Sequence, residues 1–163
     1  MATELNHDTI KAAIVTVLKS DVTNIFDVSG GTDKLRAITV GYPLGGDPFE
    51  DKDRNYAFVV NNVTLESNKR VGSTTADEHN AIEHTIRYDV HFIMHGEQGR
   101  DCEKNLDTMQ KAIMEVLEED QDLGATVDGS FPERVVVLRP ETSLGKSKQG
   151  RIITIKAIKT TGG

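Results

Sequence analysis

Hydrophobic residues recur along the chain with a helical spacing in two regions, which predicts two helices. Near the start, apolar residues recur at steps of three and four: Ile10, Ala13, Ile14, Val17 and Leu18. Asn6 stands at the expected N-cap, with Leu5 and Ile10 placed to form a hydrophobic staple around it. A second helix is predicted over Asp101–Glu119 from the stripe Cys102, Leu106, Met109, Ile113, Val116 and Leu117. Gly124 lies just beyond its end.

The segment Ile82–Met94 alternates with period two and predicts a long strand with one apolar and one polar face. At ~3.3 Å per residue such a strand spans about 40 Å, so its N-terminal part is expected to project beyond the body of the sheet. Shorter extended patterns predict five more strands: Asn24–Val28, Leu35–Val40, Tyr56–Asn61, Arg134–Arg139 and Arg151–Lys159. The last two are expected to form a wide hairpin.

Helices set apart from runs of strands predict an α+β fold. We expect a mostly antiparallel β-sheet with two α-helices packed on one face, connected by long loops, as a single domain over 1–163. Residues 66–80 are small and polar. So long a segment in a compact domain is either a functional loop or an extended hairpin arm, which here would span 62–81.

The composition narrows the class of protein. The chain has 163 residues, 37% of them hydrophobic, which is enough for one modest core. No stretch approaches the ~20 apolar residues that span a bilayer, and the N-terminus lacks the features of a secretory signal. The single Cys102 excludes an internal disulfide and a zinc site built from several cysteines. We therefore expect a soluble protein made inside the cell, with no membrane partner and no cofactor.

Charge is distributed unevenly along the sequence. The net charge is −7, yet residues 81–130 carry 12 acidic and 4 basic groups, whereas residues 131–163 carry 2 acidic and 7 basic groups. Acids crowd the C-terminal end of the second helix, where the helix dipole favours cations, and this favours an external partner. The candidate subunit-contact residues are Glu115, Glu118, Glu119, Asp120, Arg134, Arg139, Lys146, Lys148, Lys69 and Arg70. Two alternatives are solvated charged faces and contact between the basic and acidic strips within one chain.

Residues that could carry chemistry are few. His91 and His95 share a strand face with Asp89 and Glu97, which is one route to a metal-dependent enzyme. Ligands four apart in a strand are ~13 Å apart, however, so one ion could join them only across a bend. His84 and Cys102 are predicted to be core or rim residues. The glycine-rich segment 41–46 lacks the features of a phosphate loop, and no nucleophile elbow is present, so we expect no enzymatic activity.

Binding to nucleic acid is a stronger alternative than enzymatic activity, although little in the sequence supports it. The C-terminal third is basic, but the chain as a whole is acidic and no aromatic residues interleave these bases.

The order of elements resembles the tail terminator and tail-completion (neck) proteins of long-tailed bacteriophages. The resemblance rests above all on the strand segment Ile86-Arg87-Tyr88-Asp89-Val90-His91-Phe92 and the following helix segment Leu106-Asp107-Thr108-Met109-Gln110-Lys111-Ala112-Ile113. It covers nearly the whole chain in the order of its helices and strands.

The resemblance implies a structural virion protein, assembled in the host cytoplasm and located in the neck region of the tail. Such proteins form a ring, typically a hexamer, at the head-proximal end of the tail tube, stop tube polymerisation and join the tail to the head connector. The expected partners are further copies of this chain, the tail tube protein, the connector or neck proteins, and genomic DNA that passes through the lumen without specific binding. An alternative from the same neck is a head-completion or adaptor protein. Acidic residues of 41–55 or 66–80 would then face the channel and repel DNA.

Overall fold

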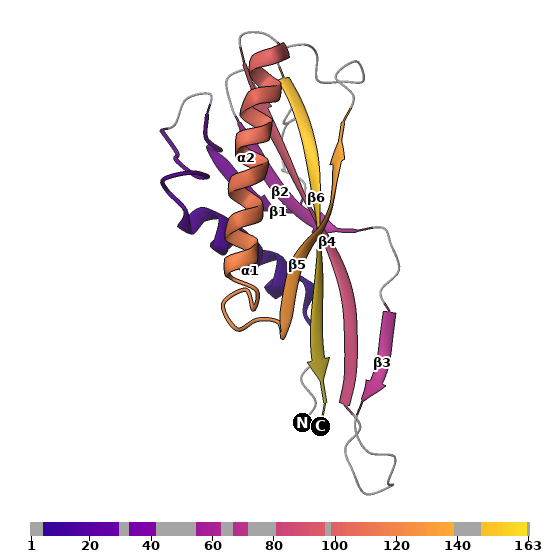
Figure 1. The fold of residues 1–163 in the computed structure, drawn as a ribbon. Coiled ribbons are helices and arrows are strands. Elements are labelled where there is room, and N and C mark those ends of the chain that lie inside the picture. Colours follow the sequence, from indigo (N-terminus) through magenta and orange to yellow (C-terminus); the bar gives the residue numbers. More distant parts are fainter. Residues whose placement is uncertain are drawn as a thin grey trace, which may run out of the picture.

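The computed structural model describes residues 5–29, 33–41, 55–62, 67–71, 81–96, 99–138 and 148–162. It has two helices, α1 (His7–Ser20) and α2 (Gly99–Glu119), and one six-stranded sheet (Figure 1). The strands are β1 (Ala37–Val40), β2 (Tyr56–Asn61), β3 (Ser67–Val71), β4 (Ala81–His95), β5 (Gly129–Val137) and β6 (Lys148–Thr161). The α+β fold is therefore confirmed.

The strand order is β1-β2-β4-β6-β5, with β3 paired to β4 beside this path. Only β1 and β2 are parallel among these pairs; the others are antiparallel. The expected hairpin of β5 and β6 is present. β4 lies at the centre and pairs with β6 along almost its whole length, from Ile82↔Thr161 to His95↔Lys148.

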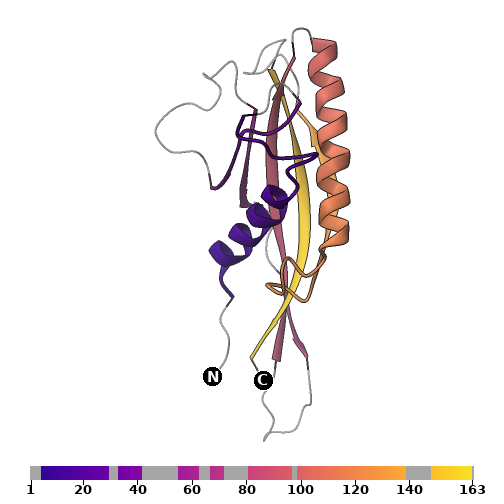
Figure 2. The ribbon, with the colours of Figure 1, turned by 90° about the vertical axis from the view of Figure 1, so that its left-hand side faces the viewer.

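Both helices pack on the same face of the sheet, where the main core lies. α2 runs along the length of the sheet in Figure 2. The even-numbered residues of β4 from Ile86 to Met94 form the floor of this core, and all of them are buried. The helices contribute the other side, including Ile14, Leu18, Leu106 and Ile113. The predicted apolar stripes thus meet the predicted apolar strand face.

The ends of the helices follow the local sequence. Asn6 caps α1 by accepting a hydrogen bond from the Thr9 N–H at 3.0 Å, as predicted. α2 begins two residues before the predicted start and ends at the predicted Glu119. Gly124 adopts φ +67, a left-handed conformation that suits glycine in the turn after α2.

The sheet extends beyond the helices at one end. β3 pairs with Ala81–Thr85 of β4, while β2 pairs only with the later residues Tyr88–Ile93. Figures 1 and 2 both show β3, the start of β4 and the end of β6 reaching past the end of α2. We call the pair of segments Ser67–Val71 and Ala81–Thr85 the arm.

Two strand predictions need correction. Asn24–Val28 is not a strand: the Asp21 carboxylate accepts from the Thr23 and Asn24 N–H groups and holds a turn, leaving a single bridge between Phe26 and Leu35. β5 begins at Gly129 rather than Arg134 because a bulge between Pro132 and Arg134 admits the proline into the strand.

Burial extends to the helix-free face of the sheet at β2, as the unbroken apolar run of this strand predicts. Tyr56, Phe58 and Val60 form a second apolar cluster there with Ile93, and all four are at most 8% exposed. β2 points alternate side chains to both faces, and both sets are apolar, so burial extends to the second face at this part of the sheet.

Candidate functional site

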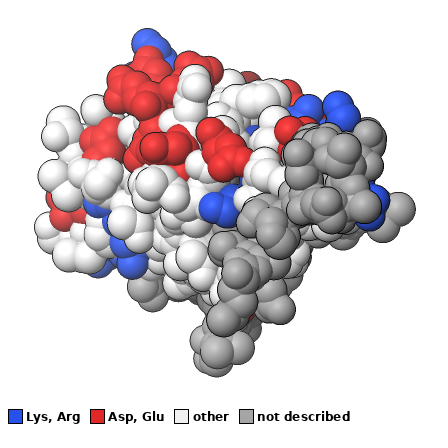
Figure 3. Space-filling view, turned by 90° about the horizontal axis from the view of Figure 1, so that it is seen from below, with Lys and Arg blue, Asp and Glu red and all other residues white. Residues whose placement is uncertain are grey.

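Acidic side chains gather at the C-terminal end of α2. Glu115, Glu118 and Glu119 are exposed, and Asp120 is half-buried. The last turn of α2 contains no basic residue. We call these four residues the acidic end of α2. Their negative charges lie at the negative end of the helix dipole, where they are unfavourable. Figure 3 shows acidic side chains gathered on this end of the molecule with few cations among them.

The local structure explains only part of this acidity. The Asp120 carboxylate accepts a hydrogen bond from the Gly124 N–H at 3.1 Å and so stabilises the turn that follows α2. No ion pair involves Glu115, Glu118 or Glu119 within the described part of the chain. These three carboxylates are exposed on the surface of that part of the chain.

The basic candidates fall on different parts of the fold. Lys69 and Arg70 are exposed on the arm, and Arg134 is exposed on β5. Lys148 is only 4% exposed, with its ammonium nitrogen 5.8 Å from the centre of the Tyr56 ring, so it lies inside the fold rather than on an accessible surface. Arg139 and Lys146 lie outside the described residues.

Contact between the basic strip and α2 within one chain occurs away from the acidic end. The Arg151 guanidinium binds the Asp107 carboxylate at 2.6 Å and the Gln110 side-chain oxygen at 2.7 Å. This pair joins β6 to the middle of α2. The acidic end of α2 therefore has no counterpart among Lys69, Arg70 and Arg134 in the described chain.

The two histidines of the metal alternative belong to separate environments. The His91 ring stacks on Phe58 with 4.7 Å between ring centroids, and burial lowers its pKa while Asp89 acts in the opposite direction. His95 is 7% exposed, with its Nδ1 2.7 Å from the Asn55 side-chain oxygen. No group of three or more potential metal ligands occurs among the described residues.

Two other residues singled out from the sequence are explained by packing. His84 bridges the arm and β6, with Nδ1 2.7 Å from the Asn68 side-chain oxygen and Nε2 2.8 Å from the Thr161 hydroxyl. Cys102 is fully buried, and burial, followed by the nearby Asp101 charge, raises the pKa of its thiol. Both predictions of a core or rim role are confirmed.

The sequence did not reveal a polar network on the helix-free face. The Asp89 carboxylate accepts from the Asn62 amide at 2.8 Å and from the Thr154 hydroxyl at 2.7 Å. Beside it, Arg87 and Glu133 form a two-point ion pair, with the shorter contact 2.8 Å, and Arg87 lowers the pKa of Glu133. Period two predicted that Arg87 and Asp89 share a face but could not identify partners from other strands.

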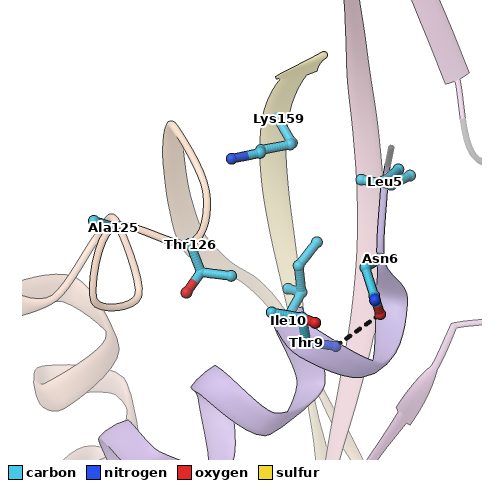
Figure 4. A pocket seen from close by; sticks show the side chains of 7 residues that line it. All are labelled: Leu5, Asn6, Thr9, Ile10, Ala125, Thr126 and Lys159. Carbon is cyan, nitrogen blue, oxygen red and sulfur yellow. Dashed lines mark hydrogen bonds between the residues drawn. The ribbon is translucent and has the colours of Figure 1, made fainter. Parts of the chain in front are cut away.

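An open pocket of about 380 Å³ lies between the start of α1, the turn after α2 and the end of β6. In Figure 4 the Lys159 side chain reaches over it from β6, facing Thr126 and Ile10. The Asn6 side chain at its rim is occupied by the helix cap. The pocket therefore presents one ammonium group above a mainly apolar floor.

No protein-family model matches this chain, and no curated protein matches its sequence. None of the described helices is long and apolar enough to cross a membrane.

Proposed function

We propose that this protein is a structural component of a long-tailed bacteriophage virion that forms a ring at the head-proximal end of the tail tube. In this role it stops tube polymerisation and joins the tail to the head connector. The proposal starts from the resemblance in element order and is supported by one structural observation. The acidic end of α2 and the exposed bases Lys69, Arg70 and Arg134 are separate surfaces with no ion pair between them in the described chain.

A ring built by rotation needs this kind of separation. Each subunit must present one surface to the neighbour on one side and a different, complementary surface to the neighbour on the other side. Opposite charges steer the subunits together and select the correct orientation. The acidic end of α2 provides one surface, and the arm or β5 provides the other. The loops proposed to line the channel, 41–55 and 66–80, lie outside the described residues except for Gly41, Asn55 and β3.

The test is reconstitution with the tail tube protein of the same phage, followed by negative-stain imaging and light scattering. The wild-type protein should cap tube ends as a ring. The variant Glu118→Lys/Glu119→Lys should lose caps, while its melting temperature changes by less than about 2 °C because both side chains are exposed. Glu103→Lys is the matched control, since Glu103 is an exposed acid in an early turn of α2.

Charge exchange identifies the opposing surface. Adding Lys69→Glu/Arg70→Glu to the defective variant should restore caps if the arm meets the acidic end, and adding Arg134→Glu should do so if β5 meets it. Equal loss of capping and of thermal stability in Glu118→Lys/Glu119→Lys would show that the acids hold the fold instead. Rings that bind head connectors but never tubes would identify another neck component.

A further inference from the structure

β5 is the last strand at one side of the sheet that the described residues form, and none of those residues pairs with part of its outer edge. The Leu138 N–H donates to the Gly150 carbonyl of β6. In an antiparallel ladder every second residue bonds to the same neighbour, so Val136 also directs its backbone groups toward β6. Val135 and Val137 therefore direct theirs away from β6, and no described strand lies beyond them.

The first half of β5 is protected from pairing, whereas the second half is not. Pro132 lies opposite Ile155, in the outward-facing set of positions, and has no N–H to offer a further strand. The bulge between Pro132 and Arg134 interrupts the edge. Beyond it, Val136 is 37% exposed and Val137 is 64% exposed. We call Val135–Val137 the valine edge.

We propose that the valine edge pairs with the same segment of a second copy of this chain, antiparallel and about a two-fold axis at Val136. In this register Val135 of each copy exchanges both backbone hydrogen bonds with Val137 of the other. The two Val136 side chains meet on the helix-free face. Every outward backbone group of the valine edge then has a partner, and every new side-chain contact within it is apolar.

Charge opposes a two-fold contact between two copies at α2 but not at this edge. The chain carries a net charge of −7, and residues 101–122 contain eight acidic and two basic groups, so two copies repel each other at α2. β5 has one acid and one base, Glu133 and Arg134, and Glu133 is held by Arg87. The side chains of the valine edge are uncharged, so two acidic molecules repel each other less there than at α2.

This inference goes beyond the proposed ring. A two-fold contact uses the same surface on both copies and closes with two of them, whereas ring contacts join different surfaces. The dimer should therefore form in solution without tail tubes, so its failure and failure of tube capping are separate results.

The first test is mass as a function of concentration, by sedimentation equilibrium on the full chain. The wild type should rise from 17.9 kDa toward twice that mass. Val137→Lys should remain monomeric, because pairing would place its ammonium group against the apolar side chain of Val135 in the other copy. Val22→Lys should behave as wild type, since Val22 is a similarly exposed valine, 67%, in the turn after α1. A wild type that stays monomeric, or a Val137→Lys variant that still dimerises, overturns the proposal.

The second test checks the register. Residues at a non-hydrogen-bonded antiparallel position have Cα atoms about 4.5 Å apart, within the range that a disulfide bridges. Val136→Cys should therefore form a disulfide-linked dimer under mild oxidation, with Cys102 silent because it is fully buried. Val22→Cys is the control and should stay monomeric. Higher assemblies without linkage through Val136→Cys would mean that the edge binds a different surface, and would also overturn the proposal.

Discussion

The two halves of β4 use one alternating pattern in different ways. From Ile86 onward, even residues are buried under the helices, and Phe92 and Met94 are fully inaccessible. In the arm the same alternation continues with Ile82, yet Ile82 is 40% exposed because no helix covers it. Alternation therefore specifies two faces along the entire strand, but the exposed fraction of each side chain depends on which elements pack over its face.

The largest expected contrast between the halves is in stability. Phe92→Ala should lower the free energy of unfolding by about 3–5 kcal/mol, because it leaves a cavity beneath α2. Ile82→Ala, at a half-exposed position in the arm, should lower it by less than about 1 kcal/mol. Denaturant unfolding of both variants measures the difference. Similar losses would show that the arm is as tightly packed as the core.

A smaller contrast is expected for two asparagines that bind histidines of β4. Asn55 is fully buried, and its side-chain oxygen accepts from the His95 N–H at 2.8 Å while its amide donates to the Lys34 carbonyl at 3.0 Å. Asn55→Ala should therefore destabilise the fold by about 1–3 kcal/mol, since buried groups lose their partners.

Asn68 contacts His84 in the exposed arm, and Asn68→Ala should change stability by less than about 0.5 kcal/mol. Thermal melting of the two variants side by side is the measurement. An Asn68→Ala variant as unstable as Asn55→Ala would contradict the distinction between the two halves.

The smallest expected effect is on the pH dependence of stability. Burial lowers the pKa of His91 in the folded protein, so the unfolded chain binds a proton more readily than the folded chain near pH 6. The contribution of neutral His91 to the free energy of unfolding is therefore present above the pKa of histidine in the unfolded chain, about 6.5, and is lost as the pH falls below that value. Unfolding free energies at pH 7.5 and pH 5 should show a loss on acidification that is reduced in His91→Gln.

His84→Gln, in the arm, is the matched control for this measurement. It should retain the part of the acid sensitivity that comes from His91. If His91→Gln and wild type lose the same stability between the two pH values, burial of the His91 ring is not a source of the pH dependence.

The candidate surface was predictable only in part. Exposure of Glu115, Glu118 and Glu119 follows from their places off the apolar stripe of α2. Burial of Lys148 did not, because it depends on the Tyr56 ring of β2, a strand distant in sequence. The position of Arg151 against Asp107 likewise depends on how α2 crosses β6. Charge counts along the chain identify acidic and basic segments but not which of their members find partners in the same molecule.

By itself, the sequence determined both helices, the central strand and the side of each that is apolar, because those properties depend on spacing within a few residues. The tertiary structure decided the parallel pairing of β1 with β2 and the bulge in β5. These depend on register between distant segments, where the free energy of pairing comes from contacts that local spacing does not encode.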